Sequence, residues 1–254
     1  MSFFKKYTRR TLNKLSKREK TLPYGTSERG FQTKNCFKDM FDILGKPKII
    51  FDVGAWEGDS TEIFLSFSPN SEVYCFEPDP VRYQQLEKNF KNKDNVYTFN
   101  VAIGEKEGVQ DLFQFDHSPS NSLMPFKKDA QRYLFHETKI LGKSQVNVTT
   151  LDKFCETHSI ESIDLLKMDI QGNETRLISG AERLLRNKKV NLIFSELIFV
   201  ELYENQGKYF EIQILLDKFG YSLFDYYNFV YDKNGQLGWG DGIFLPIKSK
   251  ITGI

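Results

Sequence analysis

Short apolar runs alternate with helix-like segments from residue 48 onward. A run of consecutive apolar residues bounded by turn-forming residues indicates a buried strand, whereas apolar residues at helical spacing indicate a helix. The pattern predicts strands over residues 48–53, 71–77, 95–103, 163–169, 190–196, 221–227 and 241–247, and helices over residues 60–68, 79–92, 148–158, 173–187 and 208–220. Strands that are apolar throughout are typical of a parallel sheet with helices on both faces. The sequence therefore predicts an α/β fold with a doubly wound, mostly parallel seven-stranded sheet.

Residues 104–148 interrupt this alternation. Glycines and prolines divide the segment into short polar and aromatic pieces, and such residues mark turns and loops. We expect an insertion after the third strand, formed by a β-hairpin and a mobile loop over residues 117–122.

The length of 254 residues suits one large domain, because domains usually span about 100–200 residues. We predict a basic N-terminal arm and lead-in segment over residues 1–47 and a single domain over residues 48–254. No apolar run approaches the ~18 residues of a membrane-spanning helix. The three cysteines form no CxxC motif and no recognisable disulfide framework, which favours a reducing, cytoplasmic location.

The net charge of +1 conceals an asymmetry. Residues 1–20 carry eight Lys and Arg side chains against Glu19 alone, giving +7, while the remaining 234 residues carry −6. An acidic body offers little attraction to nucleic acid, so we do not expect a nucleic-acid partner for the domain. The arm interleaves its basic residues with Phe, Tyr and Leu, which fits peripheral contact with the anionic inner face of a membrane. A solvated leader is the other interpretation, and the sequence predicts no oligomeric state.

A glycine-rich turn follows the first predicted strand. Gly54 lets the backbone turn tightly, and Gly58 lets the next helix begin close by. The spacing is not the G-x-G-x-x-G of dinucleotide sites, and no G-K-[ST] follows, so both a pyrophosphate cradle and a P-loop are disfavoured. The second strand ends in Glu77-Pro78, where a carboxylate can accept hydrogen bonds from two ribose hydroxyls. Adenosine without a phosphate cradle suggests S-adenosylmethionine, and Asp52 could then face its sulfonium or amino group.

Seven motifs in order along the chain resemble the FkbM-type methyltransferase family. They are FDVGAWEGDST (51–61), Glu77-Pro78, Asn100-Val-Ala102-Ile-Gly104, VTTLDKF (148–154), LLKMDIQGNE (165–174), Gly180-Ala181 and Ser195-Glu196. The resemblance implies the Rossmann-like class I methyltransferase fold, S-adenosylmethionine as methyl donor, and usually O-methylation of a sugar or glycoside hydroxyl. It implies cofactor contacts from Asp52, Gly54, Ala55, Trp56, Gly58, Ser60, Thr61, Glu77, Pro78 and Asp169, with Asn100 and Ala102 near the adenine.

The chain departs from the family pattern at two positions. Trp56 stands where Asn is common, which affects contacts near the methionine end of the donor. Gln171 stands where Glu is common, so the role of a carboxylate there does not carry over.

Methyl transfer to an alcohol requires a base that takes the hydroxyl proton. Asp169 and Glu196 end the fourth and fifth strands, and we expect one of them to be the base or to orient it. His117 in the insertion is the alternative base. Glu174 is either a third carboxylate in this crevice or a helix cap. Three carboxylates could instead bind Mg²⁺, but we predict no metal.

The leading hypothesis is therefore an S-adenosylmethionine-dependent O-methyltransferase acting on a sugar, glycoconjugate or similar small molecule. Two alternatives stay open: a non-catalytic nucleotide-binding module, and a nucleic-acid methyltransferase that uses the basic arm. Against the second, Asp169-Ile-Gln-Gly172 lacks the Asn/Asp-Pro-Pro-aromatic pattern associated with methylation of base amines.

Overall fold

A computed structural model describes residues 35–134, 138–232 and 234–247. The basic arm, His136 and the C-terminal residues lie outside these ranges. The seven strands of the main sheet are β1 (Ile49–Val53), β2 (Glu72–Phe76), β3 (Val96–Phe99), β7 (Ile163–Met168), β8 (Val190–Ile198), β9 (Tyr221–Tyr231) and β10 (Leu237–Pro246). Their order across the sheet is β3-β2-β1-β7-β8-β10-β9.

The sheet is parallel except at one edge. β10 is antiparallel to both β8 and β9, whereas the other neighbours run parallel. The strand order reverses between β1 and β7, which is where ligands bind in open α/β sheets. The predicted doubly wound, mostly parallel seven-stranded sheet is confirmed, and it is the Rossmann-like fold that the resemblance implied.

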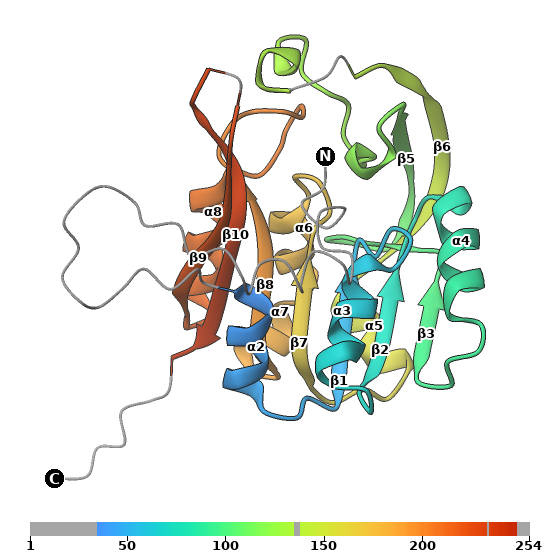
Figure 1. The fold of residues 1–254 in the computed structure, drawn as a ribbon, viewed down its shortest axis with the longest axis vertical. Helices are drawn as coiled ribbons and strands as arrows, with labels where there is room; N and C mark the ends of the chain where they lie inside the picture. Colours follow the sequence, from blue (N-terminus) through green and yellow to red (C-terminus); the bar gives the residue numbers. More distant parts are fainter. Residues whose placement is uncertain (1–34, 135–137, 233, 248–254) are drawn as a thin grey trace, which may run out of the picture.

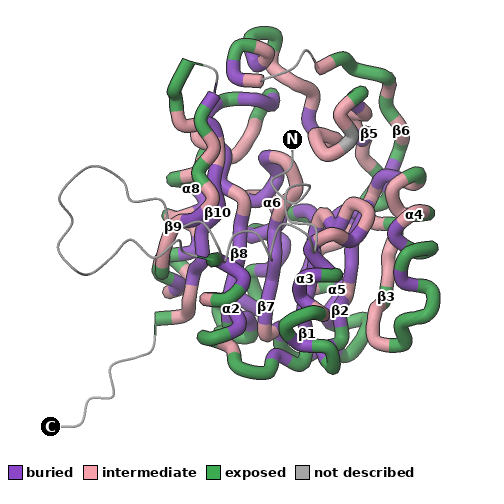
Figure 2. Tube along the Cα trace, in the orientation of Figure 1, coloured by how far each residue is buried: buried purple, intermediate pink, exposed green. Residues whose placement is uncertain are grey.

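Helices cover both faces of this sheet (Figure 1). They are α2 (Cys36–Leu44), α3 (Asp59–Phe67), α4 (Pro80–Phe90), α5 (Leu151–Thr157), α6 (Glu174–Ser179), α7 (Glu182–Arg186) and α8 (Tyr209–Lys218). Adjacent strand residues point to opposite faces, so Phe51 and Leu166 pack with α5–α8, while Ile50 and Leu165 pack with α2–α4. Figure 2 shows the resulting band of buried positions along the central strands.

Two predicted elements are interrupted in the structure. The single strand expected over residues 95–103 divides into β3 and β4 (Ala102–Ile103), and β4 joins a separate sheet. The chain bends at Asn100, whose Nδ2 donates to the backbone oxygens of Glu77 and Pro78 at 2.9 and 3.0 Å. The helix expected over residues 173–187 divides into α6 and α7 at Gly180, which lies against the backbone of Gly104.

The insertion contains the predicted hairpin. β5 (Gly108–Phe115) pairs antiparallel with β6 (Ile140–Thr149), and β4 completes a three-stranded sheet of order β4-β6-β5. Two short 3₁₀ helices, η2 (Ser118–Ser120) and η3 (Ala130–Tyr133), lie in the connection between β5 and β6. The hairpin stands beyond the carboxyl ends of the parallel strands (Figure 1), so the insertion can cover a site there.

One helix was not predicted from the sequence. α2 lies in the lead-in segment, begins after Asn35, whose side chain caps the backbone N–H of Lys38, and ends at Gly45. Its residues Phe37 and Met40 are buried with those of α3 and β8. Over the described ranges, no helix is long and apolar enough to cross a membrane.

Candidate active site

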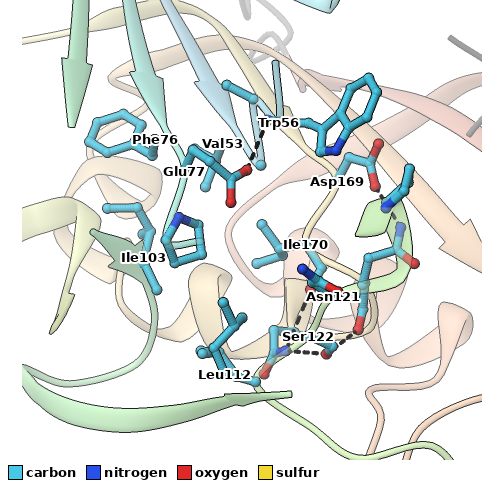
Figure 3. Close-up of a pocket in the computed structure, with 18 of the residues that line it drawn as sticks. Val53, Trp56, Phe76, Glu77, Ile103, Leu112, Asn121, Ser122, Asp169 and Ile170 are labelled. Atoms are coloured by element: carbon cyan, nitrogen blue, oxygen red, sulfur yellow. Dashed lines mark hydrogen bonds between the residues drawn. The ribbon is translucent and has the colours of Figure 1, made fainter. Parts of the chain in front are cut away.

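A pocket opens at the carboxyl ends of β1, β2 and β7, beneath the insertion (Figure 3). It encloses about 840 Å³, counting the part open to solvent, which is the size of a small-molecule site. Residues after the strands and residues of the insertion line this first pocket: Val53, Gly54, Ala55, Trp56, Asp59, Ser60, Phe76, Glu77, Pro78, Val101, Ala102, Ile103, Leu112, Pro119, Asn121, Ser122, Leu123, Lys167, Asp169, Ile170, Gln171 and Asn173. Eight of the residues expected to bind cofactor are among them.

Glu77 follows β2, and its carboxylate points into the first pocket (Figure 3). Its two oxygens accept hydrogen bonds from the backbone N–H groups of Trp56, at 2.9 Å, and Asp79, at 2.8 Å. Burial raises the pKa of Glu77 to about 7, although these two donors act in the opposite direction. Each carboxylate oxygen has a second lone pair, so Glu77 can still accept from two hydroxyls of a ligand.

The turn after β1 contains backbone conformations with positive φ, which L-residues rarely adopt. Gly54 has φ +80°, and a Cβ there would lie 1.9 Å from the backbone oxygen of Asp169. The missing side chain therefore makes room for the end of β7 rather than for a ligand. Trp56 has φ 51°, a value uncommon outside glycine, and its backbone N–H is thereby aimed at Glu77. Gly58 lies against the ring of Phe90 and lets α3 and α4 pack closely.

Four of the predicted cofactor residues are not among those that line the first pocket: Asp52, Gly58, Thr61 and Asn100. Asp52 is fully buried and accepts from the hydroxyl of Thr61 at 2.7 Å. Gly58 serves helix packing, and Asn100 holds the loop after β2 by the bonds described above. The structure therefore gives these residues supporting positions, while Glu77 and Asp169 face the cavity.

Lys167 is a buried cation that the sequence analysis did not single out. Its Nζ lies 3.0 Å from Asp52 Oδ1, 2.7 Å from the Gly54 backbone oxygen and 3.9 Å from Asp169 Oδ2. Burial acts to lower the pKa of Lys167, but Asp52 and Asp169 outweigh it and raise that pKa above its ordinary value. A lysine in a mostly apolar strand is the signal in the sequence, because lysine is almost never fully buried unless it is paired.

A second pocket of about 430 Å³ adjoins the first. Its lining combines the insertion with β8, β10 and the segment after β8: His117, Pro119, Ser120, Phe126, Leu134, Gln171, Glu196, Ile198, Leu202, Tyr203 and Trp239. Pro119 and Gln171 line both pockets. Of the three candidate bases, Asp169 faces the first pocket, while Glu196 and His117 face the second.

By residue type alone, the aromatic side chains of Tyr226, Tyr227 and Trp239 could line an acceptor site. Trp239 does line the second pocket. Tyr227 instead bonds Asp39 of α2 at 2.9 Å, and Tyr226 lies 3.4 Å from Gln213 of α8. The sequence could not separate these three, because β10 and β9 carry aromatics on both faces.

Three carboxyl groups lie near Glu196: Glu174 and Asp241 are buried, and Asp169 is partly buried. Burial is the largest cause that raises the pKa of Glu196 well above its ordinary value, and the charges of Asp169, Asp241 and Glu174 act in the same direction. Asp241 lies opposite Glu196 in the β8–β10 ladder, and burial raises its pKa to about 7. The side-chain amide of Gln171 links Asp169 to Glu196: its Nε2 donates to Asp169 Oδ1 at 2.9 Å and to Glu196 Oε2 at 2.8 Å.

Glu174 has a supporting role in this structure. Its Oε1 accepts from the backbone N–H groups of Ile170, at 3.0 Å, and Gly172, at 3.3 Å. It therefore fixes the loop after β7, and α6 has no side-chain cap hydrogen bond. Within the ranges that the structure describes, no group of three or more His, Cys, Asp or Glu residues is arranged to hold a metal ion.

Residues 117–123, the insertion loop, are bonded to the strand ends below them. Asn121 Nδ2 donates to Asp79 Oδ2 at 2.6 Å, and Ser122 Oγ donates to the backbone oxygen of Gln171 at 2.9 Å. His117 Nδ1 lies 3.1 Å from Ser120 Oγ within the loop. Asn121 and Ser122 also line the first pocket. Sequence reasoning missed them because their contacts span 42 and 49 residues.

Comparison with known proteins identifies the family. The model of the methyltransferase FkbM domain matches residues 52–223, more than half of the chain. The chain is 31% identical over 182 residues to the 2-O-methyltransferase NoeI of Sinorhizobium fredii (strain NBRC 101917 / NGR234), covering 66% of this chain and 71% of that protein. It is 27% identical over 226 residues to methyltransferase sdnD of Sordaria araneosa, covering 77% and 83%.

A solved structure of precorrin-6y C5,15-methyltransferase from Geobacter metallireducens GS-15 superposes with a TM-score of 0.47 at 10% identity, covering 89% of this chain and 95% of that one. The family match rests on the sequence comparisons, and it spans both the glycine-rich turn and the carboxylates that face the two pockets. The chain belongs to the FkbM methyltransferase family and is an S-adenosylmethionine-dependent methyltransferase.

Proposed function

We propose that this methyltransferase acts on a hydroxyl group of a sugar or glycoconjugate. The observation that carries the proposal is the position of Asp169 and Glu196, which are joined through Gln171 at the boundary between the two pockets. A donor in one pocket and an acceptor in the other would meet at these carboxyls.

The first pocket has the chemistry that S-adenosylmethionine requires. Pro78, Ala102 and Leu112 form an apolar part suited to adenine, and Glu77 offers free lone pairs for the ribose hydroxyls. Asp169 supplies negative charge for the cationic end of the methionine part. When bound, the donor supplies an electrophilic methyl group on a sulfonium. The protein's part is to hold donor and acceptor in line and to remove a proton.

The second pocket suits an acceptor with both apolar and polar faces. Phe126, Tyr203 and Trp239 supply aromatic surface, while Glu196 and His117 supply polar groups. A sugar presents both an apolar and a polar face, because its ring C–H groups can pack on aromatic side chains and its hydroxyls can form hydrogen bonds. The 2-O-methyltransferase among the relatives supports oxygen as the methylated atom.

Proton removal falls to the Asp169–Glu196 pair in this proposal. A raised pKa makes the Glu196 carboxylate a stronger base once it is ionised. That carboxylate would accept the hydroxyl proton as the methyl group passes from the sulfonium sulfur to the acceptor oxygen, which leaves S-adenosylhomocysteine as the second product. His117 is the alternative base, because it lines the same pocket.

The test is release of S-adenosylhomocysteine by the full chain against a panel of nucleotide sugars and glycosides. Asp169→Asn and Glu196→Gln keep side-chain shape while removing the base. We expect at least one of them to lower turnover by about 100- to 10,000-fold. Glu196→Gln should change S-adenosylhomocysteine affinity little, because Glu196 lines only the second pocket, whereas Asp169→Asn also removes charge from the first pocket and should weaken that affinity. Glu161→Gln, at an exposed position, is the matched control and should leave turnover unchanged.

Two results would contradict the assignment. If both variants keep full turnover while His117→Ala abolishes it, the histidine is the base. If EDTA abolishes turnover and Mg²⁺ restores it, the carboxyls are metal ligands. Unfolding midpoints of all variants show whether a loss reflects misfolding.

A further inference from the structure

Gln171 occupies an unusual position at the centre of the site. It follows β7 with φ 54°, in the left-handed region where non-glycine residues are uncommon and which often marks functional sites. The neighbouring Gly172 also has positive φ, and the Gln171 backbone oxygen accepts from Ser122. The backbone is therefore held in a conformation that turns the Gln171 side chain toward the boundary between the pockets.

Every polar atom of the Gln171 amide is used. Nε2 directs its two hydrogens to Asp169 Oδ1 and Glu196 Oε2, and Oε1 accepts from the Tyr203 hydroxyl at 2.8 Å. Burial, and to a lesser extent the charge of Glu196, raise the pKa of Tyr203 well above its ordinary value. The phenol therefore keeps its proton and remains a donor. A flipped amide would set Oε1 against two carboxyls and leave Tyr203 facing N–H groups. The Tyr203 hydroxyl also lies 3.0 Å from the backbone oxygen of Ser120, so Tyr203 and the two carboxyls together set the orientation of the amide.

The groups around Glu196 explain why a neutral donor matters there. Asp169 on β7, Asp241 on β10 and Glu174 on α6 all disfavour its ionised form. Lys167 contributes positive charge from β7, and Tyr203 and His117 face the same pocket. An N–H group that donates to a carboxylate stabilises its ionised form. A carboxyl side chain in place of Gln171 would add one more group that has to carry a proton or a negative charge.

We propose that Gln171 is a positioning residue: it holds Asp169 and Glu196 as one hydrogen-bonded pair and keeps a carboxylate available for the acceptor's proton. This rests on the proposed function, in which that pair receives the proton. Gln171 itself keeps its protons throughout. A glutamine at this position gives the site one negative group fewer than a glutamate would, and a fixed donor in its place.

The direct test is carbon-13 NMR of the full-length protein with labelled glutamate side chains, without donor or acceptor. The Glu196 signal is the one that is lost in Glu196→Gln. We expect Gln171→Met, which has similar length but no donor, to raise the titration midpoint of Glu196 by about one pH unit. Gln145→Met, at an exposed position of β6, is the matched control and should leave the midpoint unchanged. An unchanged midpoint in Gln171→Met overturns the inference.

The pH dependence of turnover separates this inference from the proposed function. In Gln171→Met and Gln171→Glu, the acid limb of kcat/KM should move to higher pH together with the Glu196 midpoint, whereas a merely structural role would lower the rate equally at all pH values. If the NMR midpoint moves and the acid limb does not, Gln171 acts as inferred but Glu196 is not the base. If neither moves, the inference is wrong.

Discussion

Glu77 shows how a single side chain can be both buried and available to a ligand. Two backbone N–H groups hold its carboxylate in place, and only 7% of its surface is exposed. Its remaining lone pairs face a cavity that has a mostly apolar lining. Burial brings its pKa to about 7, so in the free protein near neutral pH the group is ionised only in part.

This charge state predicts that S-adenosylhomocysteine affinity depends on pH. Ribose hydroxyls donate to the carboxylate form, so binding lowers the pKa of Glu77 and releases a proton wherever the free group is protonated. The Kd should be flat above about pH 7 and should rise as the pH falls below it, by up to tenfold per unit. Titration calorimetry from pH 5.5 to 8.5, in buffers of different ionisation enthalpy, measures both affinity and proton release.

Glu77→Gln provides the comparison for that experiment. It removes the titrating group and one acceptor, so at pH 8 we expect about a tenfold or greater loss of affinity, corresponding to about 1.5–3 kcal/mol. The slope below pH 7 should largely disappear. A variant that keeps both the wild-type affinity and the wild-type slope would show that Glu77 does not hold the ribose.

At the scale of elements, α2 is part of the core although it precedes the first strand. The ring of Phe37 lies 6.2 Å from that of Phe64 on α3 and 6.1 Å from that of Phe194 on β8. The same cluster contains residues of β1 and β2. The helix therefore helps to cover the face of the sheet that carries α3 and α4.

We expect Phe37→Ala to lower the free energy of unfolding by about 3–5 kcal/mol, because it leaves a cavity in a packed cluster. Ile43→Ala on the same helix is the control: that side chain is 40% exposed, and its loss should cost only about 0.5 kcal/mol. Urea unfolding of the full chain compares the two. Equal losses would mean that α2 does not pack as described.

Sequence patterns predicted the main sheet because each buried strand is a local apolar run. They did not predict the breaks at Asn100 and Gly180, which depend on contacts with Glu77 and Gly104 that are distant in sequence. α2 is different: Asn35, Gly45 and apolar residues at helical spacing were all visible before the structure.

The same distinction holds for the candidate site: residues at strand ends were predictable, and long-range contacts were not. Glu77 and Asp169 end strands, so the fold class alone brought them to one edge of the sheet. The insertion loop could not be placed, because Asn121 and Ser122 meet the strand ends through long-range hydrogen bonds. The contact of Gln171 with two carboxyls was equally hidden, since it depends on a left-handed backbone conformation.

At the scale of the whole molecule, the topology explains why the two pockets adjoin. The strand order reverses between β1 and β7, and the first pocket lies at that reversal. β8 and β10 continue the sheet and contribute residues to the second pocket. The same insertion lines both pockets. Under the proposed function, a donor and an acceptor held in these pockets would meet at the same pair of carboxyls without any rearrangement of the sheet.

The most direct test of this account is a crystal structure of the full chain with S-adenosylhomocysteine. We predict the ligand in the first pocket, with both ribose hydroxyls within hydrogen-bonding distance of Glu77, adenine beside Ala102 and Leu112, and the sulfur directed toward Asp169 and Gln171. A ligand bound elsewhere, or a ribose that faces away from Glu77, would contradict the account.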